Sequence, residues 1–143
     1  MPKPVVSKAS TVWNGDLFSG SGSTELAGSG LGPLDVDWRS RAEEGPGPRT
    51  SPEELLAAAH ATCYSMALSN GLAQNGTPPT RLDSSAEVTF VAGEGITGVK
   101  LAVRAQVADL SAEDFARLAE EAKAGCPVSQ ALAVDITVDA SLG

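Results

Sequence analysis

Alternating hydrophobic and polar residues predict β-strands near both ends of the chain. Val12-Trp13 precedes Asn14-Gly15, a dipeptide that favours a turn, and glycines punctuate the short β-like segments that follow as far as Gly32. Three later segments alternate with the period of half-buried antiparallel strands. These segments are residues 86–90, 99–107 and 134–138.

A long helix is predicted to begin at Pro52. Ser51 can cap it, proline suits the first helical position, and Glu54 completes a capping box. The helical segment continues to Gly71 or Gly76 and carries no charged residue after Glu54. A helix without charge on any face needs burial on all sides, which one small domain rarely provides. We therefore expect an intimate homodimer with this helix near its centre.

A second helix is predicted from the capping box between Ser111 and Asp114. One apolar stripe packs it against the core, and Gly125 ends it as a C′ glycine. The stripe consists of Phe115, Leu118, Ala119 and Ala122. Cys126-Pro127 then starts a short helix through Leu132. Antiparallel strands packed against a long buried helix make an α+β fold.

Composition and charge restrict the classes of function that are possible. With 143 residues, 42% of them hydrophobic, the chain has the size of one globular domain, residues 1–143. The net charge of −8 argues against nucleic-acid and anionic-membrane partners, because both select clustered lysine and arginine. No signal-peptide core or membrane span is recognisable, so we expect a cytoplasmic protein. There, the two cysteines would be core thiols, reactive thiols or metal ligands rather than a structural disulfide.

The two cysteines occupy different local environments. Cys63 lies well inside the long helix, where the helix dipole does not act, so a thiolate there needs a nearby cation. The candidates, in the charged loop 39–50 before the helix, are Arg39, Arg41 and Arg49. Cys126 lies at the start of the next helix, where free N–H groups favour a thiolate. The residues alone leave open which thiol attacks, and a buried core thiol is the alternative at Cys63.

His60 is the only histidine, and with Glu53 it shares roughly one side of the long helix with Cys63. It is a core histidine, a base that activates Cys63, or one metal ligand beside both cysteines and Glu53. The metal alternative lacks the closely paired cysteines or histidines that make zinc motifs specific. A structural role for His60 is our expectation.

Two segments closely resemble the cysteine motifs of the OsmC family, the osmotically inducible protein C-like hydroperoxide reductases. SPEELLAAAHATCYSMAL, residues 51–68, is similar to the first motif, and AKAGCPVS, residues 122–129, is similar to the second. The predicted order of strands and helices fits as well, so the resemblance covers essentially the whole chain. The second segment resembles OsmC proper more than its organic-hydroperoxide-resistance relatives.

The resemblance implies an OsmC-like fold, in which antiparallel sheets pack around the long central helices of an intertwined homodimer. It also implies a peroxiredoxin-like peroxidase that uses no metal or cofactor. Such an enzyme reduces organic hydroperoxides in preference to hydrogen peroxide and serves oxidative and osmotic stress defence. By position, Cys63 resembles the peroxidatic thiol and Cys126 the resolving thiol. Glu53 matches the acid that orients the family's catalytic arginine.

That arginine is best matched by Arg41, because Trp38 lies three residues before it as an aromatic residue does in the family; Arg39 is the alternative. The implied mechanism has Cys63 attack the peroxide and become a sulfenic acid, which Cys126 converts to a disulfide. A dithiol reductant of the lipoyl-protein or thioredoxin type then reopens the disulfide. An apolar set would line the substrate pocket: Leu34, Trp38, Met66 and Phe115.

Two other functions remain open on the sequence alone. One is metal binding through cysteine and histidine, and the other is non-catalytic binding in the stress response on the same fold. Retained metal would indicate the first, and thiols that do not react with peroxide would indicate the second.

Overall fold

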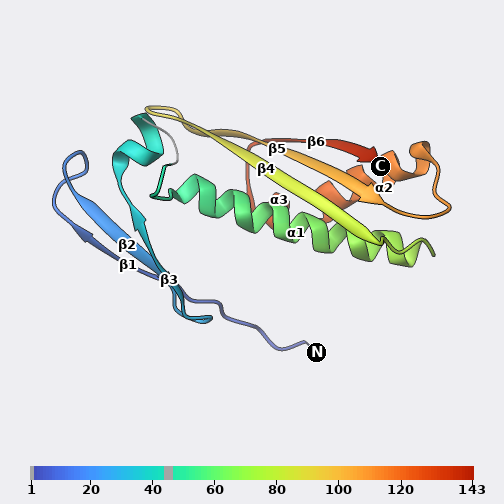
Figure 1. Cartoon of the computed structure of the whole chain (residues 1–143), viewed down its shortest axis with the longest axis horizontal. Helices are drawn as coiled ribbons and strands as arrows, with labels where there is room; N and C mark the ends of the chain where they lie inside the picture. Colours follow the sequence, from blue (N-terminus) through green and yellow to red (C-terminus); the bar gives the residue numbers. More distant parts are fainter. Residues whose placement is uncertain (1, 44–46) are drawn as a thin grey trace. The chain divides into compact units, whose positions relative to one another are not determined.

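The computed structural model describes residues 2–43 and 47–143. These residues form two compact units, one that ends at Pro52 and one that begins at Glu53. Each unit contains a three-stranded sheet, and the second also contains the long helix (Figure 1). The α+β class predicted from the sequence is confirmed.

The first unit is an antiparallel meander of three short strands. They are β1 (Ser10–Asn14), β2 (Ser21–Leu26) and β3 (Leu31–Val36). At the predicted Asn14-Gly15 turn, Gly15 has a φ of 91°, and the Trp13 indole N–H donates to its carbonyl over 3.0 Å. A short π-helical segment, η1 (Arg39–Glu43), follows where we expected a loop, and residues 44–46 of that loop lie outside the described residues.

The second unit packs helices against a mixed sheet. Its elements are α1 (Pro52–Gln74), β4 (Arg81–Val91), β5 (Gly95–Gln106), α2 (Ala112–Gly125), α3 (Pro127–Ala131) and β6 (Asp135–Leu142). In Figure 1, α1 runs along the length of the sheet. The β4–β5 hairpin is antiparallel, but β6 pairs with β5 in parallel, contrary to the expectation of antiparallel strands throughout. The reason is the connection: α2 and α3 return the chain to the end of the sheet where β5 began.

One face of α1 supplies much of the core. Its buried residues recur every four or seven positions, as one side of a helix requires. They are Glu53, His60, Tyr64, Leu68 and Leu72. After Glu54, the opposite face carries exposed but uncharged residues, among them Met66 at 68% exposure. Alternate residues of β5 pack in the same core, from Val99 to Ala105.

The predicted apolar stripe of α2 is confirmed, because its four residues are the buried residues of that helix. Ser111 caps α2 as predicted, its hydroxyl accepting from the Asp114 N–H over 3.1 Å. The Tyr64 hydroxyl donates to the Ala119 carbonyl over 3.1 Å and so joins α1 to α2.

The helix ends partly differ from the prediction. α1 ends at Gln74, and Gly76 follows with a φ of 83°, so Gly71 lies inside the helix. The prediction that Gly125 is a C′ glycine is wrong: it belongs to α2, and Cys126 is the extended C-cap residue. Pro127 explains this, because the residue before a proline is driven out of the helical region.

Within the described residues, the structure contains no helix that combines the length and apolar character needed to cross a membrane.

Candidate active site

Cys63 and Cys126 lie 63 positions apart in the sequence but come together inside the second unit. Cys63 projects from α1 and is partly exposed, whereas Cys126, at the junction of α2 and α3, is fully buried. Both are free thiols, and their side chains lie close enough for each to shift the pKa of the other. Cys126 is the N-cap residue of α3 with proline at its first position, as predicted.

The local contacts favour a proton on Cys63 and negative charge on Cys126. Burial raises the pKa of the Cys63 thiol, and although the Val128 N–H opposes this, the hydrogen bond and charge of Cys126 raise it further. Burial also acts to raise the pKa of Cys126, but hydrogen bonding of its charged form outweighs burial and lowers that pKa. The neighbouring groups that favour its charged form are the Ser129 and Val128 N–H groups, the Ser129 hydroxyl and the Cys63 thiol.

His60 lies on the same buried face of α1 and is fully enclosed. Its Nε2 atom is 2.7 Å from Ser129 Oγ, a hydrogen bond that joins α1 to α3 across 69 positions of sequence. Burial lowers the pKa of His60, so the imidazole is neutral at neutral pH. Its Nδ1 atom has no hydrogen-bond partner among the described residues. The structure therefore connects His60 to the cysteines through a serine to which we assigned no role from sequence.

A cavity of about 570 Å³ opens beside Cys63 between α1 and α2. Its wall includes Cys63, Met66, Ala67, Leu118 and Ala122, and Asn70, Gln74 and Glu121 contribute polar groups. Gly125 and Pro127 line it too, but the intervening Cys126 does not. A molecule in this cavity thus meets Cys63 and not the fully buried Cys126. Met66 lines the cavity as expected, whereas Phe115 is 2% exposed and belongs to the core.

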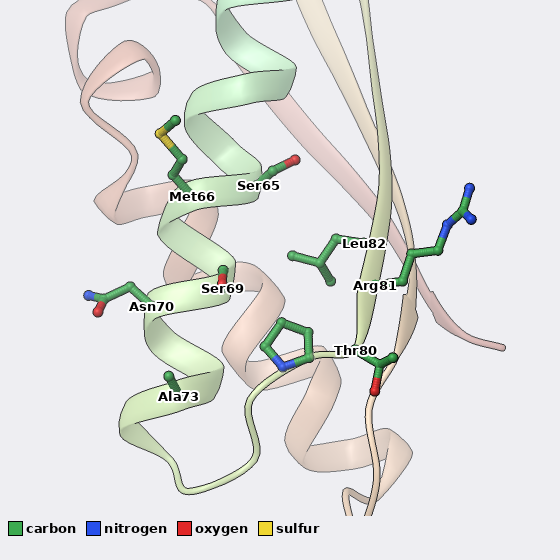
Figure 2. A pocket seen from close by; sticks show the side chains of 9 residues that line it. Ser65, Met66, Ser69, Asn70, Ala73, Thr80, Arg81 and Leu82 are labelled. Carbon is green, nitrogen blue, oxygen red and sulfur yellow. The ribbon is translucent and has the colours of Figure 1, made fainter.

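A second cavity, of about 630 Å³, lies between α1 and the start of β4 (Figure 2). Ser65, Ser69 and Leu82 line it, and the Arg81 guanidinium points away from the helix. Arg81 pairs instead with Asp83 over 2.8 Å. With no thiol, histidine or carboxylate in its wall, this cavity offers less chemistry than the one beside Cys63.

The remaining candidates divide between the two units. Glu53, in the first turn of α1, is 5% exposed and engages neighbouring groups. Arg39 and Arg41 lie in η1 of the first unit, where Arg39 forms a 3.9 Å ion pair with Glu43 at the surface. Arg49 lies 3.5 Å from Asp37. No group of three or more histidine, cysteine or acidic residues within residues 2–43 and 47–143 is arranged to hold a metal ion.

Comparison with known proteins decides the family. Residues 45–141 match the OsmC-like protein family. Over 140 residues the chain is 41% identical to the peroxiredoxin OsmC of Escherichia coli (strain K12), a match that covers 94% of this chain and 95% of that protein. The chain belongs to the OsmC family. Peroxiredoxin OsmC of Shigella flexneri matches this OsmC-family chain to the same extent.

Solved structures share the OsmC-like fold. An organic hydroperoxide resistance protein OsmC from Legionella pneumophila has a TM-score of 0.67 at 23% identity, with 99% of each chain covered. An organic hydroperoxide resistance protein from Elizabethkingia anophelis has a TM-score of 0.69 at 20% identity, with 100% of this chain and 99% of that chain covered. The OsmC-like α+β fold of the single chain, predicted from the cysteine motifs, is thereby confirmed.

Proposed function

We propose that this OsmC-family chain is a thiol-dependent peroxidase that reduces organic hydroperoxides, and hydrogen peroxide less efficiently, in oxidative and osmotic stress defence. One observation carries the proposal: Cys63 lines an open cavity and its side chain is a close neighbour of the buried Cys126. An accessible thiol beside a buried one suits a reaction in which peroxide oxidises the accessible thiol to a sulfenic acid and the buried thiol then converts that sulfenic acid to a disulfide. The relatives named peroxiredoxin and organic hydroperoxide resistance protein support the same class of reaction.

Accessibility supports Cys63 as the attacking thiol. The Cys63 thiolate attacks one peroxide oxygen, the O–O bond breaks, and the other oxygen leaves as an alcohol after taking a proton. Cys63 is then a sulfenic acid, which Cys126 attacks to form the disulfide and release water. A dithiol reductant, of the lipoyl-protein or thioredoxin type, restores both thiols by exchange. No metal or other cofactor enters the scheme.

A cation must stabilise the Cys63 thiolate, because the contacts within its own unit favour charge on Cys126. We assign this role to Arg41, oriented by Glu53 through a charge-assisted hydrogen bond, as the family resemblance implies. Arg41→Ala should therefore slow the oxidation of Cys63 more than Arg39→Ala, the matched control on the same short helical segment.

The cavity supports an organic rather than an inorganic substrate. Side chains of Met66, Ala67, Leu118 and Ala122 give it an apolar wall next to Cys63. Removing the hydrocarbon part of a hydroperoxide from water against such a wall contributes roughly 25 cal/mol per Å² of buried apolar surface. Hydrogen peroxide has no such group and gains nothing from this wall.

We further propose that two chains form a homodimer, each contributing its whole length as one OsmC-like domain, and that the dimer is cytoplasmic. The exposed uncharged face of α1 supports dimerisation, because a soluble helix ordinarily carries charge on its solvent side. Every residue of β1 is also exposed within the single chain. Light scattering coupled to size exclusion should give twice the chain mass, and a monomer at micromolar concentration would contradict this part of the proposal.

The peroxidase proposal is tested by intact-mass analysis after one equivalent of cumene hydroperoxide. The wild-type chain should lose about 2 Da as the disulfide forms, and Cys126→Ser should gain about 16 Da and then stall. Cys63→Ser should remain unchanged and show no turnover. An unchanged wild-type mass would sink the proposal and favour a non-catalytic binding protein, while stoichiometric zinc after purification would favour metal binding.

A further inference from the structure

The buried hydrogen bond between His60 and Ser129 has no part in the peroxidase scheme described above. Its two residues are almost completely enclosed, with 0% and 9% of their surfaces exposed, and their 2.7 Å separation is short for a neutral pair. Ser129 is the third residue of α3, and Cys126 is the N-cap residue of that helix. In this relation the third residue's side chain reaches back towards the cap. The Ser129 hydroxyl thus bonds to His60 and is also one of the groups that favour the charged form of Cys126.

The unpartnered ring nitrogen indicates the direction of the hydrogen bond. Nδ1 of His60 has no partner among the described residues. A buried N–H without an acceptor is rarer in proteins than a buried acceptor without a donor. We therefore assign the proton of the neutral imidazole to Nε2, which donates to Ser129 Oγ. The hydrogen of the Ser129 hydroxyl is then left to point at Cys126, whose charged form it contacts.

We propose that His60 and Ser129 are positioning residues that prepare Cys126 to close the disulfide. His60 orients the Ser129 hydroxyl, and the hydroxyl holds the Cys126 sulfur as an attacking thiolate. The role is specific to the second step, because Ser129 contacts Cys126 and does not line the cavity beside Cys63. This inference deepens the peroxidase function and rests on it.

The chemistry of that step balances without a further reactant. The Cys126 thiolate attacks the sulfur of the Cys63 sulfenic acid, a sulfur–sulfur bond forms, and the sulfur–oxygen bond breaks. The oxygen leaves with its own hydrogen and takes up one proton, so the product is water. This uptake balances the proton that Cys126 released when it ionised. The Ser129 hydroxyl keeps its proton throughout and acts as a hydrogen-bond donor.

Other groups next to Cys126 are accounted for in the design of the test. From α1, the titratable neighbours are Cys63 and Tyr64, the latter with its pKa raised by burial first and then by the charges of Glu120 and Cys126. From α3 itself, the neighbours are the Val128 and Ser129 N–H groups, which do not titrate. Replacing Cys63 by serine thus leaves Cys126 as the only cysteine to titrate, with Tyr64 ionising above its ordinary range.

The experiment separates the two chemical steps in a single turnover of the full-length protein. Rapid mixing with cumene hydroperoxide gives a peroxide-dependent phase for Cys63 oxidation and a peroxide-independent phase for disulfide formation. Ser129→Ala and His60→Leu should slow the second phase about tenfold or more, the effect of losing one hydrogen bond to a charged group. The rate of the first phase should stay within about twofold of the wild-type rate. Dimedone should trap the Cys63 sulfenic acid that accumulates.

Two variants distinguish positioning from a structural effect. His60→Gln carries an amide N–H near the position of Nε2 and should restore the second phase towards the wild-type rate. Ser65→Ala removes a different hydrogen bond of the same 2.7 Å length, from Ser65 to Ser84, and should alter neither phase. The proposal is overturned if Ser129→Ala closes the disulfide at the wild-type rate. It is equally overturned if His60→Gln is no faster than His60→Leu.

A second readout does not depend on peroxidase activity. In the Cys63→Ser background, ultraviolet thiolate absorbance should show that Ser129→Ala and His60→Leu raise the pKa of Cys126, whereas His60→Gln does so less. If the wild-type chain consumes no peroxide, the peroxidase proposal fails while this titration still tests the hydrogen-bond chain. If the wild type turns over but both variants leave this titration unchanged, only the positioning role fails.

Discussion

Replacing Leu68 by alanine tests whether α1 is anchored by one buried face, the face that also holds His60. Leu68 is 0% exposed and packs in the core with Leu72 and Phe115. Met66, two positions before Leu68, is 68% exposed. The two side chains have similar size and lie on the same helix, so Met66→Ala is a matched control for the loss of side-chain volume.

The magnitude follows from burial. Truncating a fully buried leucine to alanine lowers the free energy of unfolding by about 2.7–5 kcal/mol, because transfer energy is lost and a cavity remains. With a urea dependence of about 2 kcal/mol per M, a loss of about 3 kcal/mol lowers the unfolding midpoint by about 1.5 M. Met66→Ala should change the free energy by no more than about 0.5 kcal/mol where no partner covers it.

Equilibrium urea unfolding followed by far-ultraviolet circular dichroism measures both effects, with all variants at equal concentrations over a dilution series. A loss below about 1 kcal/mol for Leu68→Ala would show that the core does not depend on this face of α1. If Met66→Ala destabilises only at concentrations where the chains associate, a second copy covers Met66. An equal cost for Met66→Ala at every concentration would contradict the burial pattern itself.

Three further predictions concern titration and capping. Burial lowers the pKa of His60 below 6.5 in the folded chain, so the stability that depends on its neutral form is present above pH 6.5. This stability is lost as the pH falls, by at most about 1.4 kcal/mol per pH unit. His60→Gln should flatten the dependence of the urea midpoint on pH between pH 7.5 and pH 5.5, and an unchanged dependence would contradict the prediction. Cys126→Ala removes two causes that raise the pKa of Cys63, so iodoacetamide should alkylate Cys63 faster near neutral pH than in the wild type, and slower alkylation would refute the coupling. Ser111→Ala should cost about 1 kcal/mol of unfolding free energy through loss of the α2 cap, and a urea midpoint equal to that of the wild type would show that the cap contributes nothing.

Local signals predicted much of the fold because they act over a few residues. The start of α1 at Pro52, the turn at Asn14-Gly15 and the apolar stripe of α2 depend on neighbours in sequence, and all three are confirmed. The error at Gly125 was also local: two signals competed, and the restriction imposed by Pro127 prevailed over the preference for a C′ glycine. The parallel pairing of β6 was missed because alternation reports which residues face the core and not the direction of the neighbouring strand.

The sequence by itself determined that Cys63 lies mid-helix and Cys126 begins a helix, and the paired motifs around them identified the family. It left both thiols equally plausible as the attacking group on local grounds. Only the tertiary structure decided that Cys63 faces a cavity while Cys126 is sealed beneath it. The same holds for the contact between His60 and Ser129, residues 69 positions apart. The physical reason is that burial and side-chain hydrogen bonds depend on which distant elements pack together, and here α2 and α3 pack onto α1.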